Sequence, residues 1–190
     1  IKQVEDILEK YWNDHRMDLT VEYLTTYIFP SPFDFFQQFG TFWAEQGWSK
    51  IGHQLEDLFK RLATFLTQLN NNNLEEALNL MKFDYLSNQK LKPRKTWWHD
   101  QMDKSEKDIV FSLIGEITGI PQDIKNMDQR EFYKYIRMEK FSFDVEHFRN
   151  GKEIVGMPCY LLFYYDGNGT CEYYQIPASF FQNKLQMLES

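Results

Sequence analysis

The stretch PCYLLFYYDGNGTCEYYQI (residues 158–176) decides the fold. Residues 158–165 are almost all apolar or aromatic, which is typical of a central strand covered on both faces. The sequence DGNG at 166–169 is rich in turn formers and leads into a second run with strand character, residues 170–176. The whole stretch therefore predicts part of a small antiparallel sheet.

A further strand is expected upstream of this stretch. Apolar residues occupy alternate positions from Phe141 to Val145, as they do in a half-buried strand. Asn150-Gly151 follows, and this dipeptide is a strong hairpin signal because both of its residues tolerate a positive φ. We expect residues 139–176 to form an antiparallel meander with a turn at this dipeptide.

The first two thirds of the chain repeat at helical period instead. The clearest expected helix runs from Ile51 to Leu69, where apolar residues hold one face for about five turns. Pro32 is expected in the first turn of another helix, which ends near Gly47. Further helices are expected over residues 4–11, 18–28, 74–85 and 110–117, the third with an Asn73/Glu76 capping box, and a last short helix over 181–188.

These patterns predict an α+β fold. Residues 1–120 form mostly a helical bundle, and a small antiparallel β-meander lies near the C-terminus. We expect residues 1–190 to be a single domain with a helical lobe (1–120) and a β-rich lobe (121–190). Because the chain starts at Ile1 inside a helical pattern, we also expect it to be a fragment of a larger protein.

Composition narrows the functional classes. The 190 residues are 43% hydrophobic and 17% aromatic, which is enough to bury a real core. A net charge of −7 argues against general nucleic-acid binding, because an acidic chain repels phosphate backbones. The chain has neither an apolar run of about 20 residues nor an apolar block near its start. We expect no membrane partner and a cytoplasmic location.

No motif in the chain predicts catalysis. No histidine stands three or four residues from another histidine or a cysteine, so local metal-ligand pairs are missing from the sequence. Cys159 and Cys171 fall on neighbouring expected strands and are interpreted as core or near-core thiols. We expect no catalytic, cofactor-binding or metal-ligating residue, and no cofactor, in this chain.

One segment, KLKPRKTWWHD (residues 90–100), stands out in composition. It places four basic residues beside two tryptophans in an otherwise acidic chain, between two expected helices. One interpretation is a contact for an anionic partner, cofactor or neighbouring domain. The other is a loop whose tryptophans pin it to the core while its cations stay in water. The candidate partner- or substrate-contact residues are Lys90, Lys92, Arg94, Lys95, Trp97, Trp98 and His99.

Two aromatic segments resemble a known family. They are FPSPFDFF (29–36), continued by Gly40, Phe42-Trp43 and Gly47, and LMKFDYL (80–86) before a Lys- and Pro-containing loop. Both are similar to the C-terminal accessory region of bacterial B12-binding (cobalamin-binding) radical SAM proteins. That region is a domain of unknown function, and its parents are often labelled Mg-protoporphyrin IX monomethyl ester oxidative cyclase-like.

The resemblance implies what the rest of the protein would contain. Such parents carry an N-terminal cobalamin-binding domain and a radical SAM barrel whose Cys-x-x-x-Cys-x-x-Cys loop holds a [4Fe–4S] cluster. The two cysteines of this chain cannot supply that motif. The cluster, S-adenosylmethionine and cobalamin would therefore belong to the parent's N-terminal domains, which would be the partners of this chain. No catalytic residue carries over.

Three functions remain open from the sequence. The first is an accessory domain that packs on, or shapes, the substrate side of the catalytic barrel. The second is a stand-alone protein-interaction module that uses its aromatic surface. The third is a small-ligand-binding α+β domain with a pocket between helices and sheet.

Overall fold

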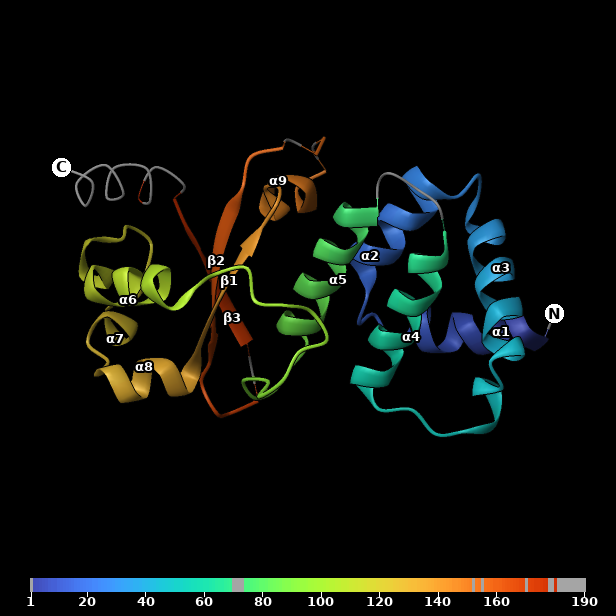
Figure 1. Ribbon diagram of the computed structural model, residues 1–190, viewed down its shortest axis with the longest axis horizontal. Coiled ribbons are helices and arrows are strands. Elements are labelled where there is room, and N and C mark those ends of the chain that lie inside the picture. Colours follow the sequence, from blue (N-terminus) through green and yellow to red (C-terminus); the bar gives the residue numbers. More distant parts are fainter. Residues whose placement is uncertain are drawn as a thin grey trace. The chain divides into compact units, whose positions relative to one another are not determined.

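The chain forms two compact units, Ile1–Tyr85 and Leu86–Ser190. The computed structural model describes residues 2–69, 74–151, 153–154, 156–169, 171–177 and 180 (Figure 1). It confirms the α+β class, with helices over most of the chain and a three-stranded antiparallel sheet towards the C-terminus. In the described part of the chain, no helix is both long and apolar enough to cross a membrane.

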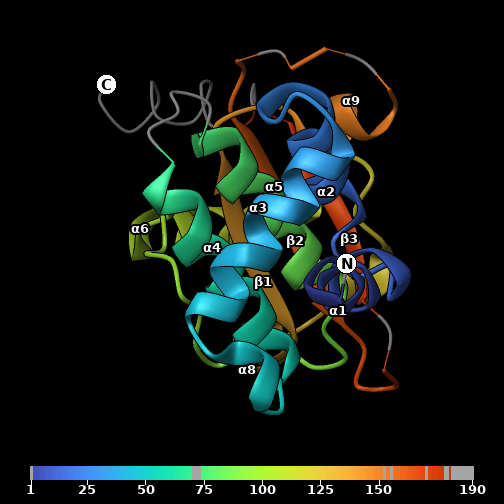
Figure 2. The ribbon, with the colours of Figure 1, turned by 90° about the vertical axis from the view of Figure 1, so that its right-hand side faces the viewer.

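The first unit is built from helices alone over its described residues. In order they are α1 (Lys2–Leu8), the π-helix η1 (Glu9–Asn13), α2 (Asp18–Tyr23), the π-helix η2 (Leu24–Ile28), α3 (Pro32–Glu45), the 3-10 helix η3 (Trp48–Lys50), α4 (Leu55–Gln68) and α5 (Leu74–Ser87), whose last residues belong to the second unit. Helix α1 packs across α3 (Figure 2). The predicted helices of this region are confirmed.

Local chemistry sets the ends of α3. Ser31 precedes Pro32 and accepts a hydrogen bond from the Asp34 backbone N–H at 3.2 Å, so the N-terminus is capped where proline fits the first turn. Gly47 follows the helix with φ +71°, a conformation that suits a residue without Cβ. Both ends agree with the sequence prediction.

Helix α4 begins later than predicted. The expected start at Ile51 is wrong, since residues 51–54 form a loop and the helix starts at Leu55. The Gln54 backbone N–H donates to the Asp57 carboxylate at 3.1 Å, and this reciprocal cap defines the first turn. The predicted Asn73/Glu76 capping box involves a residue outside the described part of the chain.

The core of the first unit is aromatic. The Tyr11 ring meets the Phe39 ring edge-on at 4.9 Å, and Phe39 stacks with Phe65 at 4.9 Å. Tyr11 also donates its hydroxyl to the Leu58 carbonyl at 2.8 Å, which satisfies the polar end of a buried ring. These contacts join η1, α3 and α4 into one packed layer.

The second unit places helices on a sheet. Its elements are α6 (Lys104–Ser112), the 3-10 helix η4 (Ile114–Glu116), α7 (Gln122–Lys125), α8 (Gln129–Tyr135), β1 (Ile136–Phe141), α9 (Val145–Arg149), β2 (Cys159–Tyr165) and β3 (Cys171–Ile176). The strand order is β1-β2-β3, with Phe141 opposite Cys159 and Tyr165 opposite Cys171. The antiparallel meander, the central strand and the turn at 166–169 are confirmed.

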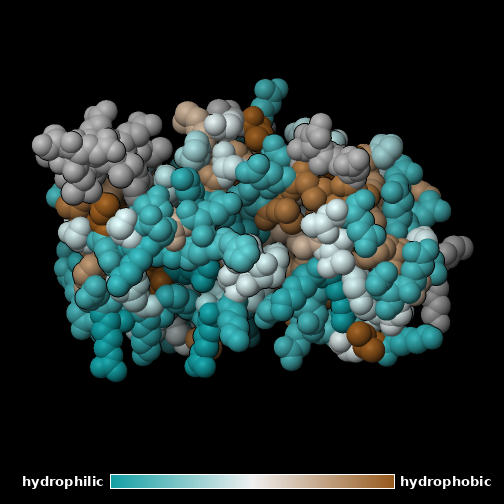
Figure 3. All heavy atoms as spheres, in the orientation of Figure 1, coloured by the Kyte–Doolittle hydropathy of each residue, from teal (hydrophilic) through white to brown (hydrophobic). Residues whose placement is uncertain are grey.

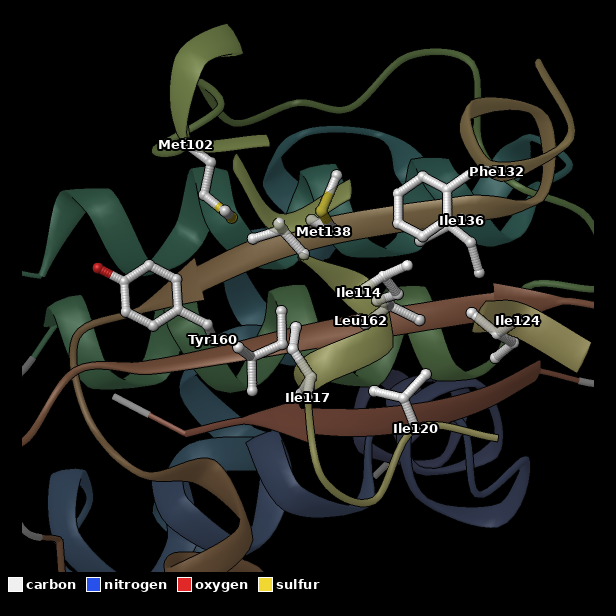
Figure 4. Close-up of a cluster of buried hydrophobic side chains, with 12 residues drawn as sticks. Met102, Ile114, Ile117, Ile120, Ile124, Phe132, Ile136, Met138, Tyr160 and Leu162 are labelled. Atoms are coloured by element: carbon white, nitrogen blue, oxygen red, sulfur yellow. The ribbon is translucent and has the colours of Figure 1, made fainter. Parts of the chain in front are cut away.

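One apolar cluster joins these helices to the sheet (Figure 4). Val110, Ile114, Ile117 and Ile120 from the α6–η4 region pack with strand residues such as Leu162. Because this packing ties residues 104–125 to the sheet, the boundary between the compact units falls at Tyr85/Leu86. The sequence had placed the boundary between lobes at 120/121.

Two details of the meander were predicted wrongly. The strand ends at Phe141, and Phe143 and Val145 are buried without belonging to it. Asp144 caps α9 by accepting the His147 backbone N–H at 3.0 Å, so a short helix replaces the expected strand.

The dipeptide Asn150-Gly151 closes that helix and does not form a hairpin turn. The Gly151 N–H donates to the Phe148 carbonyl at 2.9 Å, and Gly151 has φ +73°. Positive φ was predicted correctly, but in the wrong element. The last expected helix, over 181–188, lies outside the described residues.

Candidate functional site

The basic segment is a loop of the second unit that connects α5 to α6. Residues 88–103 contain neither helix nor strand. On the face drawn in Figure 3, the region that this loop crosses is mostly hydrophilic. The structure separates the seven candidates into two sets: Lys90, Arg94, Lys95 and His99 are exposed, whereas Lys92, Trp97 and Trp98 are partly buried.

Lys92 points into the second unit. Its Nζ donates a hydrogen bond to the Tyr133 carbonyl of α8, although the two residues are far apart in the sequence. Burial lowers the pKa of Lys92 to about 8, and the charges of Arg137 and Lys107 add to the effect. The positive charge of Lys92 is therefore more easily lost than that of an ordinary lysine.

Trp98 is fixed on strand β1. Its indole Nε1–H faces the Glu139 carboxylate, with both oxygens at 3.3 Å. Glu139 is fully buried and forms an ion pair with Arg137, whose Nη2 lies 2.6 Å from Oε1. The Arg137 guanidinium carbon also lies 5.7 Å from the centre of the Trp98 ring. The Trp97 ring meets the Trp98 ring edge-on, with 4.5 Å between the ring centres. The two tryptophans of the loop are therefore held next to the Arg137–Glu139 ion pair.

Two pockets adjoin the loop and share Lys107 and Tyr133. The smaller, of about 100 Å³, is lined by Lys92, Lys107, Arg137 and Asp100 among others. The larger, of about 410 Å³, has Lys104, Asp108 and Gln129 in its lining. Lys107 pairs with Asp100, so Lys92 and Lys104 are the cations of this region that have no carboxylate partner among the described residues.

This arrangement of residues is better suited to binding an anionic group than to catalysing a reaction. The Tyr133 hydroxyl donates to Asp108 at 2.7 Å, and burial together with this carboxylate raises its pKa, so it is a poor base at neutral pH. Burial also raises the pKa of the Cys171 thiol to about 12, which makes it a poor nucleophile. Cys159 is buried and Cys171 is half-buried, both as free thiols.

The described residues contain no group of three His, Cys, Asp or Glu side chains placed to hold a metal ion. His99, the histidine of the loop, is exposed. The expectation that the chain itself holds no cofactor stays a prediction.

Sequence reasoning missed the other half of the site. Lys107, Tyr133, Arg137 and Glu139 carry no motif that marks them, and they meet the loop only through the fold. The one available signal was a glutamate within an otherwise amphipathic strand, since Glu139 occupies a position that the sheet buries.

Comparison with known protein families places the chain in one of them. A family model described as "Protein of unknown function (DUF4080)" matches residues 1–163. Neither a curated protein nor a solved structure matches the chain significantly.

Proposed function

This chain belongs to the DUF4080 family of proteins of unknown function, and from that membership we propose that it is a non-catalytic C-terminal accessory domain of a cobalamin-binding radical SAM enzyme. The family match covers both aromatic segments, 29–36 and 80–86, on which the resemblance to that enzyme class rests. In this proposal the [4Fe–4S] cluster, S-adenosylmethionine and cobalamin are held by the parent's N-terminal domains. The parent's reaction is of the Mg-protoporphyrin IX monomethyl ester oxidative cyclase-like class.

The observation that carries the proposed role is the construction of the Lys90–Asp100 loop. Trp98 and Lys92 hold it to β1 and α8 through defined polar contacts, while Arg94, Lys95 and His99 remain exposed. An anchored loop keeps its exposed cations in place at little entropic cost on binding. In a chain of net charge −7, these cations favour an acidic partner surface or substrate carboxylates.

The small-ligand alternative is favoured by one observation, the pocket of about 410 Å³ beside Lys107 and Tyr133. That volume is within the range of small-molecule sites, which is about 300–1,000 Å³. The side chains that line it all end in a charged or polar group, whereas such sites are mostly lined by apolar residues. The pocket therefore fits an extension of the same anion contact better than a separate ligand-binding function.

The proposal is tested on the full-length protein purified without oxygen. We expect equimolar iron and sulfide, bound cobalamin, and cleavage of S-adenosylmethionine to 5′-deoxyadenosine under reducing conditions. A variant lacking the upstream cysteines of the three-Cys motif is the matched control, and it should lose the iron without losing the helical signal of this chain. A full-length protein with neither cluster nor cobalamin would rule out the proposed parent.

A further inference from the structure

Three buried nitrogen atoms without a hydrogen-bond partner cluster in the first unit, far in sequence from the basic loop. They are Trp43 Nε1, His53 Nδ1 and Arg61 Nη1. Trp43 lies on α3 and is 0% exposed, His53 lies in the loop before α4, and Arg61 lies on α4. The His53 ring is 4.7 Å from the Trp43 ring, and the Arg61 guanidinium carbon is 5.3 Å from the Trp43 ring and 5.2 Å from the Trp48 ring.

These atoms share one chemical need. An indole nitrogen and a guanidinium nitrogen only donate, and His53 Nδ1 donates whenever it carries its proton. A buried donor that remains unpaired costs about 1–3 kcal/mol, so the indole and guanidinium donors, joined by His53 Nδ1 when it is protonated, indicate that an acceptor belongs there. The need is for an acceptor, which the indoles cannot provide and which His53 Nδ1 provides only when it carries no proton.

No acidic side chain among the described residues satisfies Arg61. The two acids one turn before it on α4 are engaged elsewhere: Glu56 pairs with Lys60 at 2.5 Å, and Asp57 accepts the Gln54 N–H. Burial lowers the pKa of Arg61, and the nearby Tyr11 hydroxyl acts in the opposite direction. Among the described residues, Arg61 is thus a cation beside two indole rings with no carboxylate in ion-pair contact.

We propose that Trp43, Trp48, His53 and Arg61, the Trp43 site, bind the carboxylate of a small organic acid. One guanidinium balances the single negative charge of a carboxylate, whereas a phosphate carries more charge than this cluster offsets. A planar carboxylate also suits the forked guanidinium of Arg61, which lies beside two indole rings that meet edge to face at 76°. Because the three nitrogens are enclosed, a small free acid reaches them more readily than a side chain borne on a partner's surface.

In this proposal the acid enters through the loop between α3 and α4, which carries His53 (Figure 1). Residues 51–54 of this loop have no regular structure, Ile51 is 53% exposed, and a Cβ on Gly52 would meet nothing within 4 Å. A lightly packed loop opens locally at low cost, which gives a small molecule access without disturbing α3 or α4. The Trp43 site is independent of the function proposed above.

The test uses the full-length protein labelled with 5-fluorotryptophan and observed by ¹⁹F NMR. The Trp43 resonance is identified as the one missing in Trp43→Phe. Sodium acetate is titrated against sodium chloride at equal ionic strength, and we expect a saturable acetate-specific shift of this resonance. Arg61→Gln should weaken that binding about tenfold or more, because it removes a charged hydrogen bond. Lys60→Gln, which removes a cation from the outer side of the same helix, should bind acetate as the wild type does.

A second variant protects the test against misfolding. His53→Ala removes one donor from the loop without altering either helix, and it should also weaken acetate binding. The proposal is overturned if acetate and chloride act alike on the Trp43 resonance, if both donor variants retain wild-type binding, or if inorganic phosphate binds more tightly than acetate.

Discussion

Each unit buries a carboxylate, and the two carboxylates are held by different kinds of partner. In the first unit Asp84 of α5 is 5% exposed, and its Oδ2 accepts from the Thr20 N–H at 2.9 Å and the Thr20 hydroxyl at 2.6 Å. In the second unit Glu139 of β1 is fully buried beside the Arg137 guanidinium and the Trp98 indole. The first carboxylate meets neutral donors of the same bundle, and the second meets a cation and the loop.

The difference shows what each carboxylate does. Burial raises the pKa of Asp84 to about 7, although the hydrogen bonds from Thr20 act in the opposite direction. Asp84 can therefore become neutral by taking up a proton. Its hydrogen bonds to Thr20 join α5 to the start of α2. Glu139 connects its own strand to the Lys90–Asp100 loop through Trp98, so it links the scaffold of the second unit to the proposed contact surface.

The largest expected effect comes from removing the cation beside Glu139. Arg137→Met keeps an apolar stem on Trp98 but takes the guanidinium from a fully buried carboxylate. We expect the free energy of unfolding in urea to fall by about 3 kcal/mol. The control is Lys60→Met, because Lys60 and Glu56 form an exposed pair on α4 at 2.5 Å, which is worth at most about 1 kcal/mol. Equal losses in the two variants would contradict the comparison.

The next effect is a pH dependence that belongs to the first unit. The folded-state pKa of Asp84, about 7, lies above its ordinary value of 3.8, so the folded protein binds a proton that the unfolded chain has released. Stability is then greatest at low pH and declines as pH rises towards 7, after which this contribution is constant. From pH 5 to pH 7 we expect wild type to lose about 2 kcal/mol relative to Asp84→Asn. Parallel pH profiles for the two proteins would show that Asp84 does not titrate in this range.

Local patterns in the sequence predicted most of the fold. The apolar run and its turn residues predicted a central strand at residues 158–165, which the structure places at Cys159–Tyr165. Pro32 and Gly47 predicted the ends of α3. These features depend on neighbours within a turn or a strand, which a sequence displays directly. The Asn150-Gly151 hairpin failed because the same backbone conformation also ends helices, and Asp144 provided a cap that started one.

Only the loop residues of the candidate site could be predicted from the sequence. The loop was visible as a concentration of charge and tryptophan, but Arg137 and Glu139 are ordinary residues of a strand until the fold sets them under Trp98. The Trp43 site was invisible for the same reason, since its donors come from three elements. Contacts between residues distant in sequence depend on packing, and no local pattern records them.

The central claim is that the exposed cations of the anchored Lys90–Asp100 loop contact the catalytic part of the parent. Replacing these cations is expected to have the smallest effect on stability. Arg94 and Lys95 are exposed and lie between the anchors Lys92 and Trp98. Arg94→Glu/Lys95→Glu should therefore change the free energy of unfolding by no more than about 0.5 kcal/mol. Lys50→Glu/Arg130→Glu is the charge-matched control, with one exposed cation from each unit.

The direct measurement is the turnover of the full-length enzyme carrying each pair of reversals, with S-adenosylmethionine cleavage as the readout and melting temperature recorded in parallel. The account predicts that Arg94→Glu/Lys95→Glu has the melting temperature of the wild type but a turnover rate that is lower by about tenfold or more. The control pair should keep the turnover rate of the wild type. Full turnover in Arg94→Glu/Lys95→Glu would contradict the claim that this loop is a contact surface.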